Sequence, residues 1–110
     1  MDPAWDELLT ALCKRAGMYV LAPRFLGVDA YLSGFSHGRN DGVSKGFQEW
    51  FSYKFPVDGG YRNPVAAPQV LARHLFGVDH ARDLDEPQNE AAIQTLCALY
   101  REYMESRMAG

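Results

Sequence analysis

Apolar residues recur with a helical period through almost the whole chain, and this repeat constrains the fold more than any other feature. Near the N-terminus they occupy positions i, i+3, i+4, i+7, i+8 and i+11, as Trp5, Leu8, Leu9, Leu12, Cys13 and Ala16. Residues at these intervals share one face of a helix that has about 3.6 residues per turn. No segment alternates apolar and polar residues over the length of a strand. The pattern therefore predicts an all-α protein.

Start and stop signals divide this pattern into a compact bundle of about five helices joined by short loops. In the first helix we expect Asp2 as the N-cap, Pro3 at the first position and Gly17 as the stop. The second helix should begin near Val28 and end within residues 38–42, a run rich in turn-forming residues.

The third expected helix carries the largest aromatic stripe, formed by Phe47, Trp50, Phe51 and Phe55, with Ser44 as its N-cap. We expect this stripe to be the centre of the core, so that Trp50→Ala should cost roughly 3 to 5 kcal/mol. In the second helix, Gly34 is expected to let another backbone approach closely.

The last two helices have clear boundaries. The fourth should begin either at Asn63 or only at Ala67, and it should end at Gly77. In the fifth, Asp85 and Gln88 have the spacing of a capping box. Its apolar stripe consists of Ile93, Leu96, Cys97, Tyr100 and Met104.

The composition is that of one globular domain. The chain has 110 residues, of which 47% are hydrophobic and 23% charged, and this indicates a single domain over residues 1–110. No apolar run approaches the roughly 20 residues that span a bilayer, and the acidic start lacks the features of a signal peptide. We therefore expect a cytoplasmic protein without membrane contact. Cys13 and Cys97 should be buried, reduced thiols, with a disulfide between their helices as the alternative.

Few residues form a pattern that indicates catalysis or cofactor binding. His37, His74 and His80 show no metal-ligand spacing, and phosphate-binding loop motifs are absent. The sequence thus predicts no catalytic residue, no metal site and no cofactor, with His74 as a partly buried structural side chain. The chemically richest stretch is the turn His37–Asp41 with Ser36 before it. We interpret it as a helix-ending turn, and ligand binding or catalysis there is the alternative.

The distribution of charge gives the strongest indication of a binding surface. A formal net charge of −3 argues against a nucleic-acid-binding protein. Acidic residues gather before the fifth helix, as Asp79, Asp83, Asp85, Glu86 and Glu90. They can stabilise the start of that helix through its dipole, or they can form a docking surface for a basic protein partner.

A second candidate surface carries Tyr53 and Tyr61. The chain has six tyrosines, and tyrosine is favoured at protein interfaces because it is apolar over its ring and polar at its tip. The alternative is a purely structural role, in which these rings line the edge of the core.

Several landmarks, in their order along the chain, resemble a known family. They are Gly17-Met18-Tyr19-Val20, Tyr31-Leu32-Ser33-Gly34-Phe35, Gly46-Phe47-Gln48-Glu49-Trp50-Phe51, Lys54-Phe55, and the aromatic Tyr61 ahead of the fourth helix. Between Leu8 and Tyr103, this series resembles a family of small uncharacterised bacterial proteins, some of which look like immunity proteins of bacterial toxin systems. The resemblance implies a helical fold and direct binding to a cognate toxin.

Three functions are compatible with these residues. The leading hypothesis is a non-enzymatic immunity protein that binds and neutralises a basic toxin. The second is a structural or regulatory partner subunit, which includes a homodimer. The third is a small enzyme or ligand-binding module that uses the His37–Asp41 turn.

Overall fold

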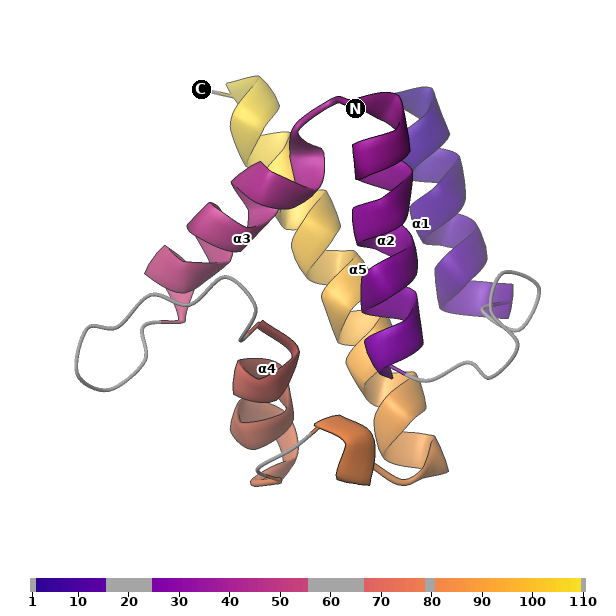
Figure 1. The fold of residues 1–110 in the computed structure, drawn as a ribbon, viewed down its shortest axis with the longest axis vertical. Coiled ribbons are helices and arrows are strands. Elements are labelled where there is room, and N and C mark those ends of the chain that lie inside the picture. The colour runs from indigo at the N-terminus through magenta and orange to yellow at the C-terminus, as the bar shows by residue number, and fades with distance from the viewer. Residues whose placement is uncertain (1, 16–24, 56–66, 79–80, 110) are drawn as a thin grey trace.

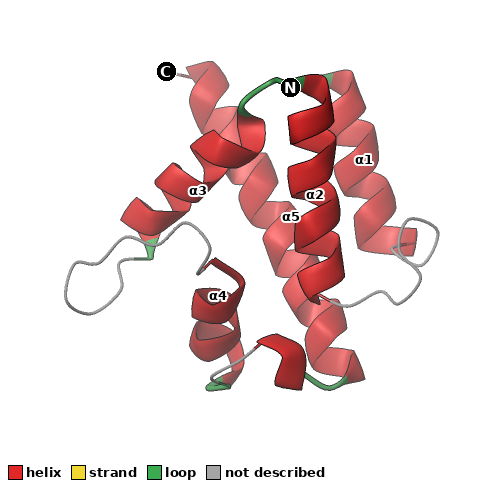
Figure 2. Cartoon of the chain, in the orientation of Figure 1, coloured by secondary structure: helices red, strands yellow, loops and turns green. Residues whose placement is uncertain are grey.

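The computed structural model describes residues 2–15, 25–55, 67–78 and 81–109, and the regular structure within these ranges is entirely helical. The elements are α1 (Pro3–Arg15), α2 (Phe25–Arg39), α3 (Val43–Lys54), α4 (Ala67–Phe76), the short 3₁₀ helix η3 (Ala81–Asp83) and α5 (Glu86–Ala109), as Figures 1 and 2 show. The predicted all-α bundle is confirmed. The expected stop at Gly17 and the earlier of the two expected starts of the fourth helix, Asn63, lie outside the described residues.

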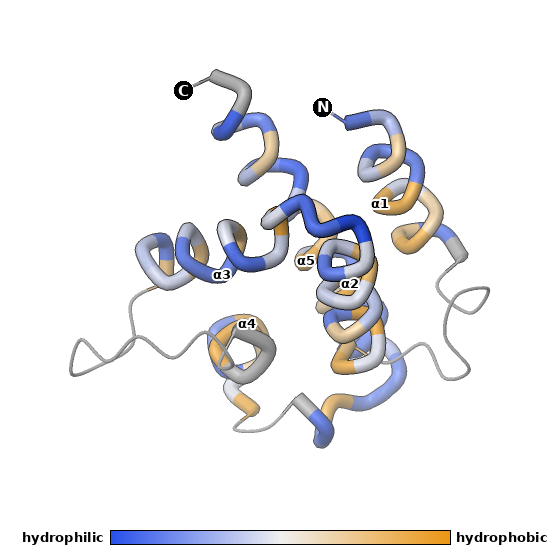
Figure 3. The backbone as a smooth tube through the Cα atoms, turned by 45° about the horizontal axis from the view of Figure 1, so that its top comes forward, coloured by the Kyte–Doolittle hydropathy of each residue, from blue (hydrophilic) through white to orange (hydrophobic). Residues whose placement is uncertain are grey.

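Helix α5 is the element around which the others are arranged. It packs against α1, α2, α3 and α4 (Figure 1). The stripe predicted for it is buried along its whole length, as Ile93, Leu96, Cys97, Tyr100 and Met104. In Figure 3, hydrophobic residues recur between hydrophilic ones along α1 and α5, as one buried face on each helix requires. The centre of the core therefore lies on α5, and the expectation that it lies on α3 is wrong.

Tyr100 of α5 lies between two aromatic rings from other helices. Its ring stacks on Phe47 of α3 with 3.9 Å between centroids, and on Trp5 of α1 with 5.7 Å between centroids. Trp5 is fully buried and meets the ring of Phe35 of α2 edge-on at 4.9 Å. Aromatic pairs of this kind contribute about 0.5 to 1.5 kcal/mol beyond the burial of their area. The rings thus connect four helices through one cluster.

Trp50 contributes less to the core than its place in the aromatic stripe suggests. Phe47 and Phe51 are buried, whereas Trp50 is only partly buried and Nζ of Lys54 lies 5.1 Å from the centroid of its ring. Trp50→Ala should therefore lower the free energy of unfolding by less than the roughly 3 to 5 kcal/mol expected from the sequence. A loss of that size is instead expected for Trp5→Ala, because Trp5 is fully buried.

Several predicted helix ends are confirmed. At the start of α1, the Ala4 N–H donates to Oδ1 of Asp2 at 2.8 Å. The capping box of α5 is present, because the Gln88 N–H donates to Oδ1 of Asp85 at 2.8 Å and the Asp85 N–H donates to Oε1 of Gln88 at 2.9 Å. Helix α4 is described from Ala67, the later of its two expected starts, to Phe76, and Gly77 follows it with φ of 68°.

The predicted start of α2 is wrong because its capping group comes from another helix. The helix begins at Phe25 rather than near Val28. The Phe25 N–H donates to Oδ1 of Asn89 in α5 at 2.8 Å, and the amide nitrogen of Asn89 donates to the Leu84 carbonyl at 2.9 Å. Asn89 is buried, so its bonds to two segments fix how α2 enters the bundle.

The predicted N-cap of α3 is also wrong. Ser44 lies inside the helix, and Gly42 occupies the N-cap position in the left-handed conformation, with φ of 70° and no side chain to serve as a cap. Instead, the Val43 N–H donates to Oδ1 of Asp41 at 3.0 Å, and the Ser44 N–H donates to Oγ of Ser36 in α2 at 3.0 Å. The start of α3 is therefore built partly by the end of α2.

The close approach predicted for Gly34 occurs at a different glycine. A Cβ added at Gly34 would meet nothing within 4 Å, whereas a Cβ added at Gly46 of α3 would lie 1.9 Å from Oη and 3.0 Å from Cζ of Tyr103. Tyr103 is buried, with its ring against Phe47 and Trp50. Gly46 therefore sets how closely α3 lies against α5.

Gly46→Ala should destabilise the protein by roughly 1 to 3 kcal/mol because its methyl group overlaps a packed ring. Gly34→Ala is the matched control in an open helix interior, and it should stabilise the protein by about 0.5 to 1 kcal/mol. Both are measured by denaturant unfolding. In a Tyr103→Phe background, which removes the nearest atom, the penalty of Gly46→Ala should shrink. Equal stability of the two alanine variants would show that Tyr103 moves aside freely.

Candidate functional site

The acidic segment predicted as a docking surface lies on η3 and the first turns of α5. Asp83, Asp85, Glu86 and Glu90 are all exposed, and Asp79 lies outside the described residues. The side chain of Asp85 is used by the capping box, so this residue has a structural role in addition to its charge. Asp83, Glu86 and Glu90 remain, and we call these three residues the acidic patch.

The acidic patch differs from the ion-paired acids of the bundle. Among the described residues, none of its three carboxylates forms an ion pair. Acids elsewhere are paired with basic residues: Asp2 and Asp41 with Arg39, Glu102 with Lys54, and Asp6 with Arg101. Glu86 and Glu90 are one helical turn apart, so their like charges face the same side of α5. The patch is therefore a concentration of exposed negative charge.

The tyrosine surface is separate from the acidic patch. Tyr53, near the end of α3, has 67% of its surface exposed, and Tyr61 lies outside the described residues. In Figure 1, α4 lies between the end of α3 and η3. The structure thus does not bring Tyr53 and the acidic patch together, and they are two different candidate surfaces.

The turn that follows α2 is organised by Asp41. Its carboxylate accepts hydrogen bonds from Nε1 of Trp5 at 2.7 Å, from Oγ of Ser36 at 2.7 Å and from the Val43 N–H at 3.0 Å. Nε of Arg39 lies 3.3 Å from the same carboxylate. One side chain thereby joins α1, α2 and the start of α3.

These contacts decide the ionisation of Asp41. Burial by itself would raise the pKa of the Asp41 carboxyl, but the hydrogen bonds from Ser36, Trp5 and Val43 and the charge of Arg39 outweigh it. The pKa of Asp41 therefore lies below its ordinary value. Asp41 is therefore a charged structural acceptor at neutral pH, which agrees with the interpretation of this stretch as a helix-ending turn.

An open depression of about 540 Å³ lies beside this turn, between the end of α2 and the start of α3. It is lined by Ser33, Gly34, Ser36, His37, Asn40, Gly42, Ser44, Lys45 and Gln48. Its hydroxyl groups bond to one another, since Oγ of Ser33 lies 3.2 Å from Oγ of Ser44, and Oη of Tyr100 lies 3.4 Å from the same atom. These hydroxyls are therefore already engaged within the protein.

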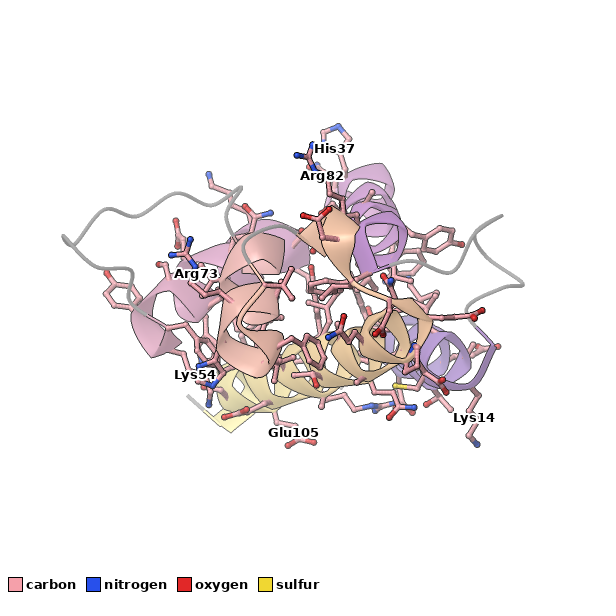
Figure 4. The ribbon with its side chains drawn as sticks, turned by 90° about the horizontal axis from the view of Figure 1, so that it is seen from below. Lys14, His37, Lys54, Arg73, Arg82 and Glu105 are labelled. Atoms are coloured by element: carbon pink, nitrogen blue, oxygen red, sulfur yellow. The ribbon has the colours of Figure 1, made fainter. Side chains whose placement is uncertain are left out.

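The turn does not assemble a nucleophile and a base. Ser36 has 3% of its surface exposed and donates its proton to Asp41. Within the described contacts, the His37 side chain forms no hydrogen bond with Ser36 or Asp41, and it is exposed at the end of α2 (Figure 4). The charged side chains labelled Lys14 and Glu105 in Figure 4 likewise extend outward from the bundle.

The described part of the chain holds no group of three or more His, Cys, Asp or Glu residues that could bind a metal ion. His80 lies outside it. His74 is exposed, with its ring 5.3 Å from that of Phe55, so the expectation of a partly buried histidine is wrong. None of the helices described here has the length and apolarity needed to cross a membrane.

Sequence reasoning did not single out Asp29, a carboxyl on α2. Burial raises the pKa of Asp29 from 3.8 to about 6. Its negative charge in turn helps to raise the pKa of Tyr100, for which burial is the main cause. Position 29 in the sequence offers no signal, because it lies in an otherwise ordinary helical pattern beside Val28.

Replacing Asp41 by Asn should lower the free energy of unfolding by about 1 to 3 kcal/mol at neutral pH, because charged acceptors make stronger hydrogen bonds. Since the folded pKa of Asp41 is lowered, its charge stabilises the fold above the unfolded value of 3.8, and this contribution is lost as the pH falls through the folded pKa. The gap between wild type and variant should therefore narrow in acid. A constant gap from pH 7 to about pH 3 would show that shape rather than charge matters.

Asp29→Asn should have the opposite dependence. The folded pKa of Asp29 is raised to about 6, so the wild type is at full stability below 3.8 and loses stability as the pH rises through 6. The variant has no such charge to bury, and it should be more stable than wild type at pH 8 by roughly 1 to 3 kcal/mol and equally stable near pH 4. Urea melts across this range provide the measurement. A variant that is less stable at pH 8 would mean that the Asp29 carboxylate has a favourable partner.

Comparison with protein-family models, with curated proteins and with solved structures finds no match for this chain.

Proposed function

We propose that this chain is a non-enzymatic protein-binding domain that docks a basic protein through the acidic patch Asp83, Glu86 and Glu90. The observation that carries the proposal is that these three carboxylates are exposed and, among the described residues, form no ion pair. Like charges one turn apart on a helix cost about 0.2 to 0.5 kcal/mol, which the dipole at the start of α5 offsets for Glu86. A basic partner would relieve the repulsion that remains.

The electrostatics of such a patch suit rapid binding. A cluster of one sign steers an oppositely charged partner during diffusion and fixes its orientation. The net charge of −3 acts in the same direction. Because Asp85 serves as a helix cap, its carboxylate is less available to bind a partner than the carboxylates of the three patch residues.

The specific role that we propose is that of an immunity protein that neutralises a cognate bacterial toxin. This part of the proposal is supported by the small size of the domain and by its sequence landmarks. From Leu8 to Tyr103 these landmarks resemble a family in which some members look like immunity proteins. An inhibitor of this kind needs a stable scaffold with a charged face and no chemistry of its own. Tyr53, which is exposed on α3, is a further contact for a partner large enough to reach past α4.

A homodimer is the alternative function, but repulsion between like charges disfavours a dimer interface at the acidic patch. A two-fold interface places a patch against its own copy, so that carboxylates would face carboxylates. A regulatory or structural subunit that dimerises would have to use another face, such as the one that carries Tyr53.

A ligand-binding module at the His37–Asp41 turn is favoured by one observation, the depression of about 540 Å³ beside it. Its volume falls within the range of small-molecule sites. Its serine hydroxyls, however, are bonded within the protein, so a ligand would have to be held mainly by the other polar lining residues, His37, Asn40, Lys45 and Gln48. We therefore rank this function below protein binding.

The proposal is tested with the triple variant Asp83→Asn, Glu86→Gln, Glu90→Gln. The partner is first recovered with the tagged wild-type protein from its own host, and association rates are then measured by stopped flow at low and high salt. The variant should associate roughly tenfold or more slowly at low salt, and its rate should depend less on salt. Co-expression should show whether the wild type, but not the variant, protects cells from that partner.

The matched control is Glu7→Gln, Glu49→Gln, Glu105→Gln, which removes the same charge from exposed acids scattered over α1, α3 and α5. It should associate at close to the wild-type rate. If both triple variants slow association equally, only net charge matters and the acidic patch is not the docking surface. If neither does, the surface around Tyr53 becomes the better candidate.

A further inference from the structure

Two cysteines that are far apart in the sequence meet between α1 and α5. Cys13 and Cys97 are free thiols, and Cys13 is close enough to Cys97 to affect the ionisation of its thiol. The two helices form the most extensive helix–helix contact in the described chain. The contact between the thiols is therefore part of the main packing interface, where neighbouring side chains restrict their positions.

A polar clamp next to the thiols fixes the register of the two helices. Arg101, one turn after Cys97 on α5, donates to the carboxylate and carbonyl oxygens of Asp6 and to Oγ1 of Thr10 on α1. Thr10 lies three residues before Cys13, on the same helix. Because one guanidinium holds two side chains of α1, sliding of one helix along the other would break several bonds at once.

The two thiols have different environments. Cys97 is fully buried, whereas Cys13 is partly exposed, so the expectation that both thiols are shielded holds only for Cys97. Burial raises the pKa of the Cys97 thiol, and the neighbouring Cys13 raises it further, against the charge of Arg101. Cys13 is therefore the sulfur that a solute in water reaches first, and Cys97 is placed behind it.

We propose that Cys13 and Cys97 form an oxidation site at which a peroxide converts the two thiols into a disulfide that links α1 to α5. The Cys13 thiolate attacks one oxygen of hydrogen peroxide, the O–O bond breaks, and Cys13 becomes a sulfenic acid while hydroxide leaves. The sulfur of Cys97 then attacks the Cys13 sulfur, its proton goes to the departing hydroxyl group, and water is released. Two thiols are oxidised and one peroxide is reduced to water.

The link would act on stability rather than on shape. The bonds from Arg101 to Asp6 and Thr10 hold the segments that carry Cys13 and Cys97 against each other, so we expect the bond to close without separating the helices. A cross-link between residues 13 and 97 encloses most of the chain and restricts the unfolded state strongly. The oxidised protein should therefore melt at a temperature at least about 5 °C higher than the reduced protein. This inference is independent of the acidic patch.

The test treats the folded wild-type protein with a small excess of hydrogen peroxide. Remaining thiols are then blocked with N-ethylmaleimide in denaturant, and the intact mass is measured. The reduced protein should take up a label on each cysteine, whereas the oxidised protein should take up none and should have lost two hydrogens. A digest without reductant should contain the Cys13 and Cys97 peptides joined together. The melting temperature should rise, and dithiothreitol should reverse every change.

Two variants separate the steps. Cys97→Ala should leave a sulfenic acid on Cys13 that dimedone traps, and Cys13→Ser should leave Cys97 slow to react until denaturant is added. Peroxide should raise the melting temperature of neither. The proposal is overturned if wild-type Cys13 proceeds to sulfinic acid while Cys97 stays free, if disulfides form between chains instead, or if both thiols survive peroxide. These outcomes are read on the wild type, so they do not depend on how well the variants fold.

Discussion

The stacking of Tyr100 between Trp5 and Phe47 is the contact on which the rest of the bundle depends. The ring separations of 5.7 and 3.9 Å bring α1 and α3 against the same side chain on α5. Once α3 is held there, Tyr103 of α5 faces it at Gly46, where only a hydrogen leaves room for the ring. Burial of these rings supplies the driving force, and their shapes decide how the helices cross.

Polar side chains then fix the helix ends that the core leaves unsatisfied. Asp41 accepts bonds from Trp5, Ser36 and Val43, so the same tryptophan that stacks on Tyr100 also orients the turn between α2 and α3. Asn89 performs the corresponding task at the start of α2. These bonds are made inside or at the edge of the core, where an unpaired donor costs more than it does in water. They therefore select one arrangement of the helices among several that the apolar stripes would allow.

The same structure explains why the surface, rather than an internal site, is the place to look for function. The hydroxyls and the carboxylate of the Ser36–Asp41 stretch are engaged in holding helices together, whereas Asp83 on η3 and Glu86 and Glu90 on α5 are exposed and have no ion-pair partner among the described residues. A docking protein needs such a division between a rigid interior and a free charged face. The thiol pair at the interface of α1 and α5 adds a means by which an oxidant would strengthen that interior.

The sequence by itself determined the helices and those caps that are local in the chain. The apolar period located the α-helices α1 to α5 of the described residues, and Asp2 and the Asp85–Gln88 box were readable because each caps a helix that follows within a few residues. It also marked the acidic residues, whose exposure follows from their charge. Only the tertiary structure decided that Tyr100 and Trp5 are more deeply buried than Trp50. It also decided that Asn89 and Asp41 accept hydrogen bonds from the first residues of α2 and α3, and that Cys13 lies near Cys97. Those features join residues from different helices, and no local spacing in a sequence encodes which faces of two helices will touch.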